Sequence, residues 1–140
     1  MNREDYFQDP VFQAELREWC APARRPAELL AEGSALLALD MQKYFLQPEF
    51  HAYIPASHGI RDRICQLCEV FKKKDCPVFF TRHVNDPCRD RRMADWWSEL
   101  LTRDHPGGGF AKPFPPTEAC IIEKSRYDAF LYTNLEDQLQ

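Results

Sequence analysis

Three short, mainly apolar runs, separated by segments of helical periodicity, constrain the fold of this chain more than any other feature. The runs lie at residues 34–40, 76–82 and 118–124. Apolar residues without alternation are typical of strands that are buried on both faces, as in a parallel sheet. Between the first two runs, apolar residues recur at the spacing of a helix: Ile60, Ile64, Leu67, Cys68 and Phe71. The alternation predicts an α/β fold, with a parallel sheet sandwiched by helices in a Rossmann-like, three-layer arrangement.

The remaining segments divide the chain into an N-terminal extension and one domain. Residues 9–20 are expected to form a short helix within an extension that covers residues 1–33. In the domain, residues 34–140, a short helix is expected over 91–101 and another from Thr133 or Asn134. The stretch "HPGGGFAKPFPP" is expected to be an irregular loop, because its glycines and prolines disfavour regular structure.

Charge and hydropathy restrict the partners of the protein. The 140 residues carry a net charge of −4, which gives no reason to expect nucleic acid or an anionic membrane as a partner. No apolar stretch approaches the ~20 residues of a membrane helix. The start, "MNREDYFQDP", lacks the apolar core of a signal peptide. A cytoplasmic protein is therefore expected.

The six cysteines favour a reduced protein without a metal site. "CQLC", followed by Cys76 and Cys88, superficially has the spacing of a four-cysteine zinc site. Its two cysteines, however, lie inside a helical repeat, and Cys76 opens an apparent strand. We interpret the cysteines as small core or surface residues, with Cys120 buried in the third strand.

The first run ends in Asp40 and the third run ends in Lys124. Right-handed crossovers place the carboxyl ends of parallel strands at one edge of a sheet, where ligands of α/β proteins bind. A carboxylate and an ammonium that meet there would offset each other's desolvation cost. The pair is either a general base or acid with an electrostatic helper, or an ion pair that holds the sheet edge together.

Three separated motifs, "ALDMQKYFL", "VFFTRHVND" and "IIEKSRYDAF", together resemble the isochorismatase-like hydrolases, also called cysteine hydrolases. The resemblance covers residues 34–140. In this family an aspartate, a lysine and a cysteine form a catalytic triad, and Asp40 and Lys124 match the first two. The resemblance implies hydrolysis of an amide-type C–N bond in a small-molecule substrate, through a thiolate and without an organic cofactor. Members of the family commonly form oligomers, so a homo-oligomer is expected.

The third member of the triad has no match in this sequence. The family's cysteine follows the next strand, whereas this chain ends at Gln140, within the preceding helix. The sequence therefore resembles a domain that is truncated before its nucleophile, with an incomplete sheet. Two alternatives remain open. One is isochorismatase-type hydrolysis of an enol ether, with Asp40 as proton donor and no cysteine. The other is a non-catalytic subunit or interaction module with an unpaired sheet edge.

Candidate substrate-binding residues follow the strands. By resemblance His83 lies near a substrate-contacting position, although an ordinary strand-end histidine is equally compatible with the sequence. Arg82, together with Arg91 and Arg92, is a candidate ligand for a substrate carboxylate. Three aromatic residues are expected near the crevice, or else in the core: Tyr44, Tyr127 and Phe130.

Some relatives, the nicotinamidases, bind zinc through an aspartate and histidines after the first strand. Gln42 and Lys43 follow Asp40 in this chain, and no aspartate-x-histidine pair occurs in the loop beyond them. We therefore interpret His51 and His58 as loop histidines and expect no metal.

Overall fold

A computed structural model describes residues 9–11, 14–15, 33–97, 99–116 and 118–140. Most of the predicted N-terminal extension, including Cys20 and most of the helix expected over 9–20, lies outside the described residues. Within the described part, no helix is both long enough and apolar enough to cross a membrane.

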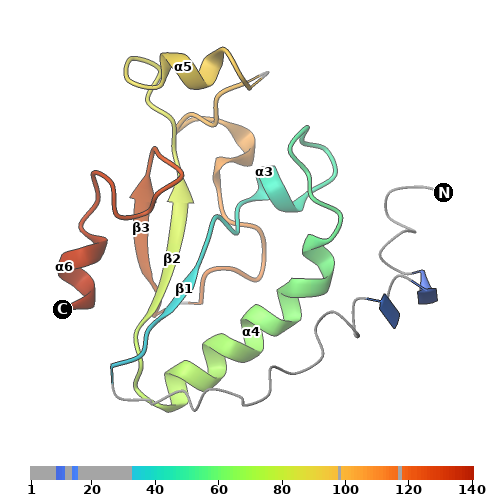
Figure 1. Ribbon diagram of the computed structural model, residues 1–140, viewed down its shortest axis with the longest axis vertical. Helices are drawn as coiled ribbons and strands as arrows, with labels where there is room; N and C mark the ends of the chain where they lie inside the picture. The colour runs from blue at the N-terminus through green and yellow to red at the C-terminus, as the bar shows by residue number, and fades with distance from the viewer. Residues whose placement is uncertain (1–8, 12–13, 16–32, 98, 117) are drawn as a thin grey trace.

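The centre of the fold is a parallel sheet of three strands in the order β1-β2-β3 (Figure 1). The strands are β1 (Leu36–Ala38), β2 (Val78–His83) and β3 (Cys120–Lys124). Ala38 lies opposite Phe80, and His83 lies opposite Lys124. All three apolar runs therefore form strands, as predicted, and their carboxyl ends meet at one edge of the sheet.

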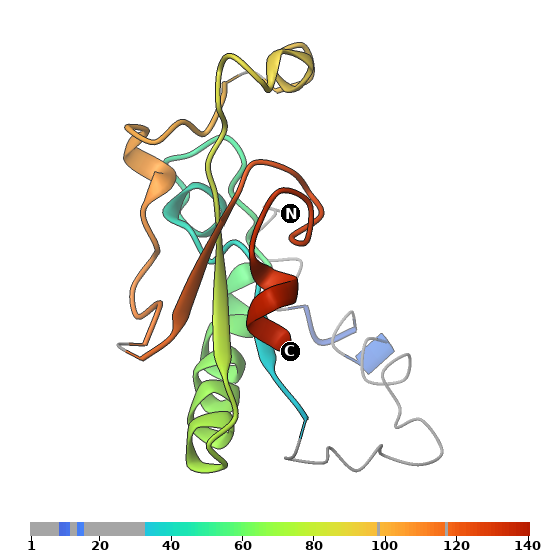
Figure 2. The same ribbon diagram turned by 90° about the vertical axis from the view of Figure 1, so that its left-hand side faces the viewer.

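Helices cover both faces of this sheet. The long helix α4 (Ser57–Lys73) lies against one face, and the short helix α6 (Leu135–Leu139) lies against the other (Figure 2). Because successive strand residues point to opposite faces, Phe80 packs with Cys68 of α4, whereas Phe79 packs with Leu135 of α6. The three layers confirm the predicted α/β class.

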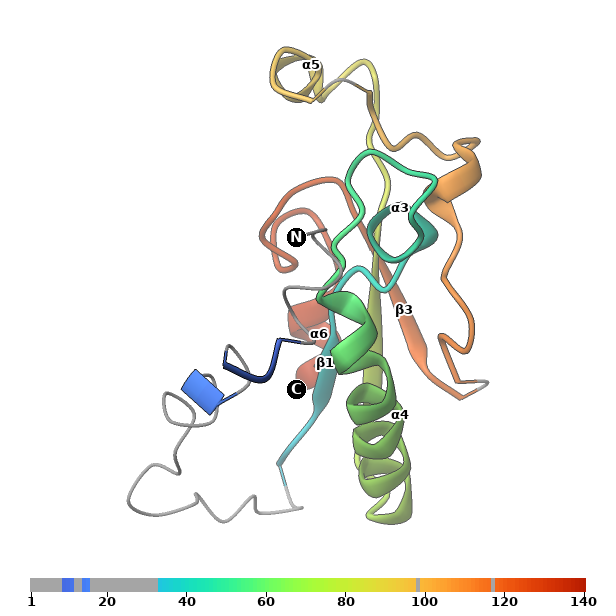
Figure 3. The ribbon, with the colours of Figure 1, turned by 90° about the vertical axis from the view of Figure 1, so that its right-hand side faces the viewer.

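Two short helices lie at the carboxyl end of the sheet. α3 (Lys43–Leu46) follows β1 directly, and the 3-10 helix η1 (Pro106–Gly108) packs against it, near the upper end of α4 in Figure 3. η1 lies in the stretch 105–116, which the sequence predicted to be an irregular loop. Gly107 is needed there, because a Cβ atom would approach the Cα of Tyr44 to 3.1 Å. The absence of a side chain at Gly107 thus lets η1 lie directly against α3.

Two predictions at the level of single elements are wrong. The helix expected over 91–101 is only α5 (Arg91–Ala94), and Trp96, which its apolar pattern would bury, is 89% exposed. Cys120, expected to be a buried residue, is exposed. The reason is its position at the start of β3, which pairs only with β2 among the described strands and has three of its five side chains exposed.

Candidate active site

Asp40 lies two residues beyond the end of β1 in a backbone conformation that is uncommon for a residue with a side chain. Its φ is +53°, in the left-handed region, which costs about 1–2 kcal/mol. Two hydrogen bonds with the fully buried Thr81 of β2 hold it there. The Asp40 N–H donates to Thr81 Oγ1 at 2.9 Å, and the Thr81 hydroxyl donates to Asp40 Oδ1 at 2.6 Å. The neighbouring strand thereby fixes the direction of the carboxylate.

Lys124, the last residue of β3, completes a buried ion pair with this carboxylate. Its Nζ lies 2.8 Å from Asp40 Oδ2 and also donates to the Arg126 carbonyl at 3.2 Å. The lysine side chain is 3% exposed and the aspartate side chain 26%. The expected meeting of the two charges at the rim of the sheet is therefore confirmed as geometry.

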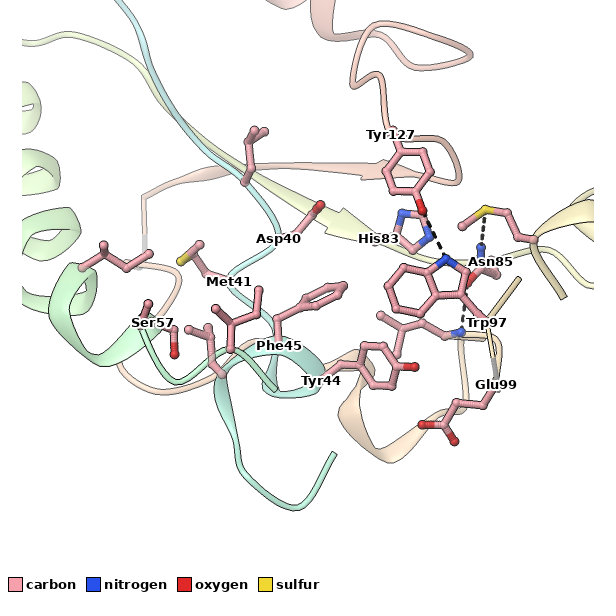
Figure 4. A pocket seen from close by; sticks show the side chains of 17 residues that line it. Asp40, Met41, Tyr44, Phe45, Ser57, His83, Asn85, Trp97, Glu99 and Tyr127 are labelled. Carbon is pink, nitrogen blue, oxygen red and sulfur yellow. Dashed lines mark hydrogen bonds between the residues drawn. The ribbon is translucent and has the colours of Figure 1, made fainter. Parts of the chain in front are cut away.

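Asp40 forms part of the wall of a cavity of about 360 Å³, which Figure 4 shows from close by. Most of the other walls are apolar, with side chains from the segment after β1, from α3, from the start of α4 and from the segment around α5. Lys124 is not one of the lining residues. It borders a second, more polar hollow, together with Glu123 and Arg126. Asp40 therefore lines the apolar cavity, whereas its countercharge borders the polar hollow.

His83, at the end of β2, also lines the apolar cavity and is 6% exposed. The buried side chain of Gln42 holds its backbone from both sides. Gln42 Nε2 donates to the His83 carbonyl at 2.9 Å, and the His83 N–H donates to Gln42 Oε1 at 2.6 Å. Gln42 also donates to the Gly108 carbonyl at 2.8 Å and so ties β2 to η1. Sequence reasoning gave Gln42 no role, although a polar residue so close to the first apolar strand was a signal.

Burial lowers the pKa of His83 below its ordinary value of 6.5, and the positive charge of Lys124 lowers that pKa further. The unfolded chain then binds a proton at a higher pH than the folded one. The contribution of His83 to the free energy of unfolding is thus fully present above pH 6.5 and is lost as the pH falls toward the pKa of His83 in the folded protein.

We expect His83→Gln to reduce the loss of unfolding free energy between pH 7.5 and 5, measured by urea titration, with His58→Gln at an exposed histidine as control. An NMR titration of the His83 ring with a midpoint above 6.5 would contradict this prediction.

The structure brings some of the other predicted residues to the cavity and not others. Tyr44 and Tyr127 line it. The Tyr127 hydroxyl accepts a hydrogen bond from Trp97 Nε1 at 3.1 Å at the rim (Figure 4). Arg82 lies away from the cavity, where its Nε donates to the Gly108 carbonyl at 3.1 Å. Phe130 is half exposed and borders neither hollow. The side chains of Arg91 and Arg92 lie outside the described part of the structure.

A cluster around Glu99 forms one end of the cavity, and sequence reasoning missed it. Glu99 Oε1 lies 3.3 Å from His51 Nδ1, and Glu99 Oε2 lies 3.4 Å from His105 Nε2. The Tyr44 hydroxyl lies 2.9 Å from the same His51 nitrogen. Burial raises the pKa of Tyr44 to about 12, and the negative charge of Glu99 and its hydrogen bond contribute to the rise. The four residues come from two segments that are far apart in the chain, 44–51 and 99–105, so no local pattern could indicate the cluster.

No three histidine, cysteine, aspartate or glutamate side chains of the described residues form a group that could hold a metal ion. The two loop histidines that the sequence singled out have other neighbours. His51 contacts Tyr44 and Glu99, and His58 Nε2 lies 2.7 Å from the Tyr53 hydroxyl. The donor set of the described site therefore does not fit a metal centre.

A parallel sheet between helices, with a cavity and an ion pair at its carboxyl edge, is the arrangement of α/β proteins, whose ligands commonly bind at that edge. A model of the isochorismatase domain matches residues 34–140. The chain belongs to the isochorismatase family, as the three motifs implied. No protein of curated function matches the chain in a sequence comparison.

Solved structures show the same fold. A cysteine hydrolase from Pseudomonas syringae pv. phaseolicola 1448A superposes with a TM-score of 0.74 at 24% identity, over 84% of this chain and 59% of that one. N-carbamoylsarcosine amidase from Thermoplasma acidophilum gives 0.65 at 22% identity, over 75% and 59%. The pyrazinamidase of Pyrococcus horikoshii, solved in complex with zinc, gives 0.63 at 26% identity, over 75% and 62%. The chain thus spans about three fifths of the length of these relatives.

Proposed function

We propose that this chain carries part of the active site of a hydrolase that cleaves the C–N bond of a small amide. The observation that supports this proposal most strongly is the 2.8 Å pair between Asp40 and Lys124 at the wall of the apolar cavity. Structural relatives that are named as amidases add support at the level of the fold. Homo-oligomer formation and a cytoplasmic location remain predictions.

In the proposed reaction Asp40 acts as the general base. Its carboxylate takes the proton of a cysteine thiol, and the thiolate attacks the carbonyl carbon of the amide. The C–N bond then breaks, the amine leaves with a proton returned by Asp40, and a thioester remains. Water hydrolyses the thioester to a carboxylic acid and restores the thiol. No step in this sequence requires a metal or an organic cofactor.

Lys124 has an electrostatic role in this proposal. Its ammonium group lies against Asp40 and favours negative charge at the rim of the sheet, both on the carboxylate and on a neighbouring thiolate. Because the lysine is almost fully buried, this charge is weakly screened. The nucleophile itself lies outside the described residues in this proposal, since no described cysteine lines the cavity.

The same observation favours a second candidate, the hydrolysis of an enol ether without a cysteine. Asp40 would then act as the proton donor to the leaving enol, and water would attack the other carbon of the ether bond. This route needs only the carboxylate and the cavity, both of which the described residues supply.

The products distinguish the two candidates. We expect the full protein to release ammonia from small primary amides such as benzamide, measured with a coupled ammonia assay. It should release no pyruvate from a carboxyvinyl ether, measured with lactate dehydrogenase. Pyruvate without ammonia would replace the first candidate with the second, and neither product would refute both.

A further inference from the structure

The charges at the apolar cavity are of one sign. Asp40 and Glu99 are among the residues that line it, and no described lysine or arginine is. The cations near the sheet edge lie elsewhere. Arg82 and Arg103 both donate to the carboxylate of Glu123, and Arg103 borders the second hollow. A ligand in the apolar cavity therefore meets two carboxylates and no cation among the described side chains.

Glu99 keeps its negative charge because its neighbours donate hydrogen bonds to it. Hydrogen bonds from His105 and His51 hold the pKa of the Glu99 carboxyl below its usual value. His105 Nδ1 accepts a hydrogen bond from the Gly107 N–H at 3.0 Å, so a neutral ring carries its proton on Nε2, which faces Glu99. The two imidazole rings thus orient the carboxylate through hydrogen bonds.

Both carboxylates already have partners within the protein, so neither needs a cation from a ligand. Asp40 is paired with Lys124, and Glu99 already has two histidines as hydrogen-bond partners. The other walls are mainly apolar and include the side chains of Met41, Phe45 and Trp97. A cavity of about 360 Å³ is at the small end of ligand sites, large enough for a molecule with one ring.

We propose that Glu99 is a specificity-determining residue of this site, which takes an uncharged amide with an apolar body and rejects carboxylate-bearing analogues of the same shape. This inference deepens the proposed function and rests on it for the identity of the site. The physical basis is desolvation: an anion in the cavity would lose its hydration beside the Glu99 carboxylate, and no described lysine or arginine lines the cavity to compensate for that loss.

Benzamide and benzoate test the proposal, since they share one shape and differ by one charge at pH 7. We expect benzamide to bind the full protein at least about tenfold more tightly than benzoate, measured by isothermal titration calorimetry. Glu99→Gln should reduce the ratio of benzamide affinity to benzoate affinity several-fold, because benzoate then binds more tightly. Glu118→Gln, a matched change at an exposed carboxylate that pairs with Lys72, should leave the ratio unchanged.

Three results would overturn the inference: benzoate that binds as tightly as benzamide, a ratio that Glu99→Gln does not alter, or no binding of either probe. Failure of the proposed function has a different signature. Benzamide could bind more tightly than benzoate while no small primary amide releases ammonia. In that case the charge preference of the cavity stands and the hydrolytic proposal is refuted.

Discussion

Replacement of Asp40 by asparagine is expected to lower kcat for amide hydrolysis by about 10²–10⁴-fold, the usual contribution of a positioned general base. Asparagine has the same shape and can still accept hydrogen bonds from Thr81 and Lys124, but it cannot take a proton from a thiol. The loss should therefore appear mainly in kcat, with a smaller effect on KM. Ammonia release by purified protein measures both parameters.

Asp62→Asn provides the matched control, because Asp62 is an exposed residue of α4. The control should retain the activity of the parent protein. Circular dichroism of both variants checks that the fold is preserved. Undiminished turnover by Asp40→Asn would contradict both the thiolate route and the enol-ether route, because each assigns proton transfer to this carboxylate.

Lys124→Met is expected to produce the largest loss of stability at the site. Methionine can fill much of the space of the lysine stem, but it leaves the Asp40 carboxylate without its countercharge. Breaking a buried ion pair in this way costs about 3–5 kcal/mol, and the partial exposure of Asp40 places the expected loss near the lower end, at about 2–4 kcal/mol. Urea titration at pH 7 measures the change in the free energy of unfolding.

A second ion pair in the same protein offers the control. Lys72 lies 2.9 Å from Glu118, but both side chains are largely exposed, so Lys72→Met should change stability far less. The double variant Asp40→Asn/Lys124→Met should recover part of the stability lost in Lys124→Met, since no unpaired charge remains. Equal effects of the Lys124 and Lys72 substitutions would show that the buried pair does not stabilise the fold.

The strands could be predicted because their signal is local. Residues 78–83 are apolar enough to read as a buried strand in isolation, and Phe79 and Phe80 do pack on opposite faces of the sheet. The convergence of Asp40 and Lys124 followed from the same signal, since parallel strands align their carboxyl ends. Burial was harder to predict. The exposure of Cys120 and Trp96 depends on which elements cover them, and local composition carries no such information.

The polar part of the site was inaccessible from the sequence for a related reason. Gln42 acquires its role by reaching across to His83 and Gly108, and Glu99 by lying between two histidines from different loops. Arg82 shows the opposite error. It follows a strand, as a ligand-binding residue often does, but its side chain lies outside the cavity, against Gly108 and Glu123.

The sequence by itself determined the class of fold, the order of strands and helices, and the edge of the sheet at which an acid and a base would meet. Periodicity and handedness suffice for these, because they act over a few residues or apply to every parallel crossover. Only the tertiary structure decided that Asp40 lines an apolar cavity while Lys124 borders a different hollow, and that Glu99 is the second carboxylate of the apolar cavity. The direction of a side chain depends on contacts between segments that lie far apart along the chain, such as the hydrogen bonds between Asp40 and Thr81.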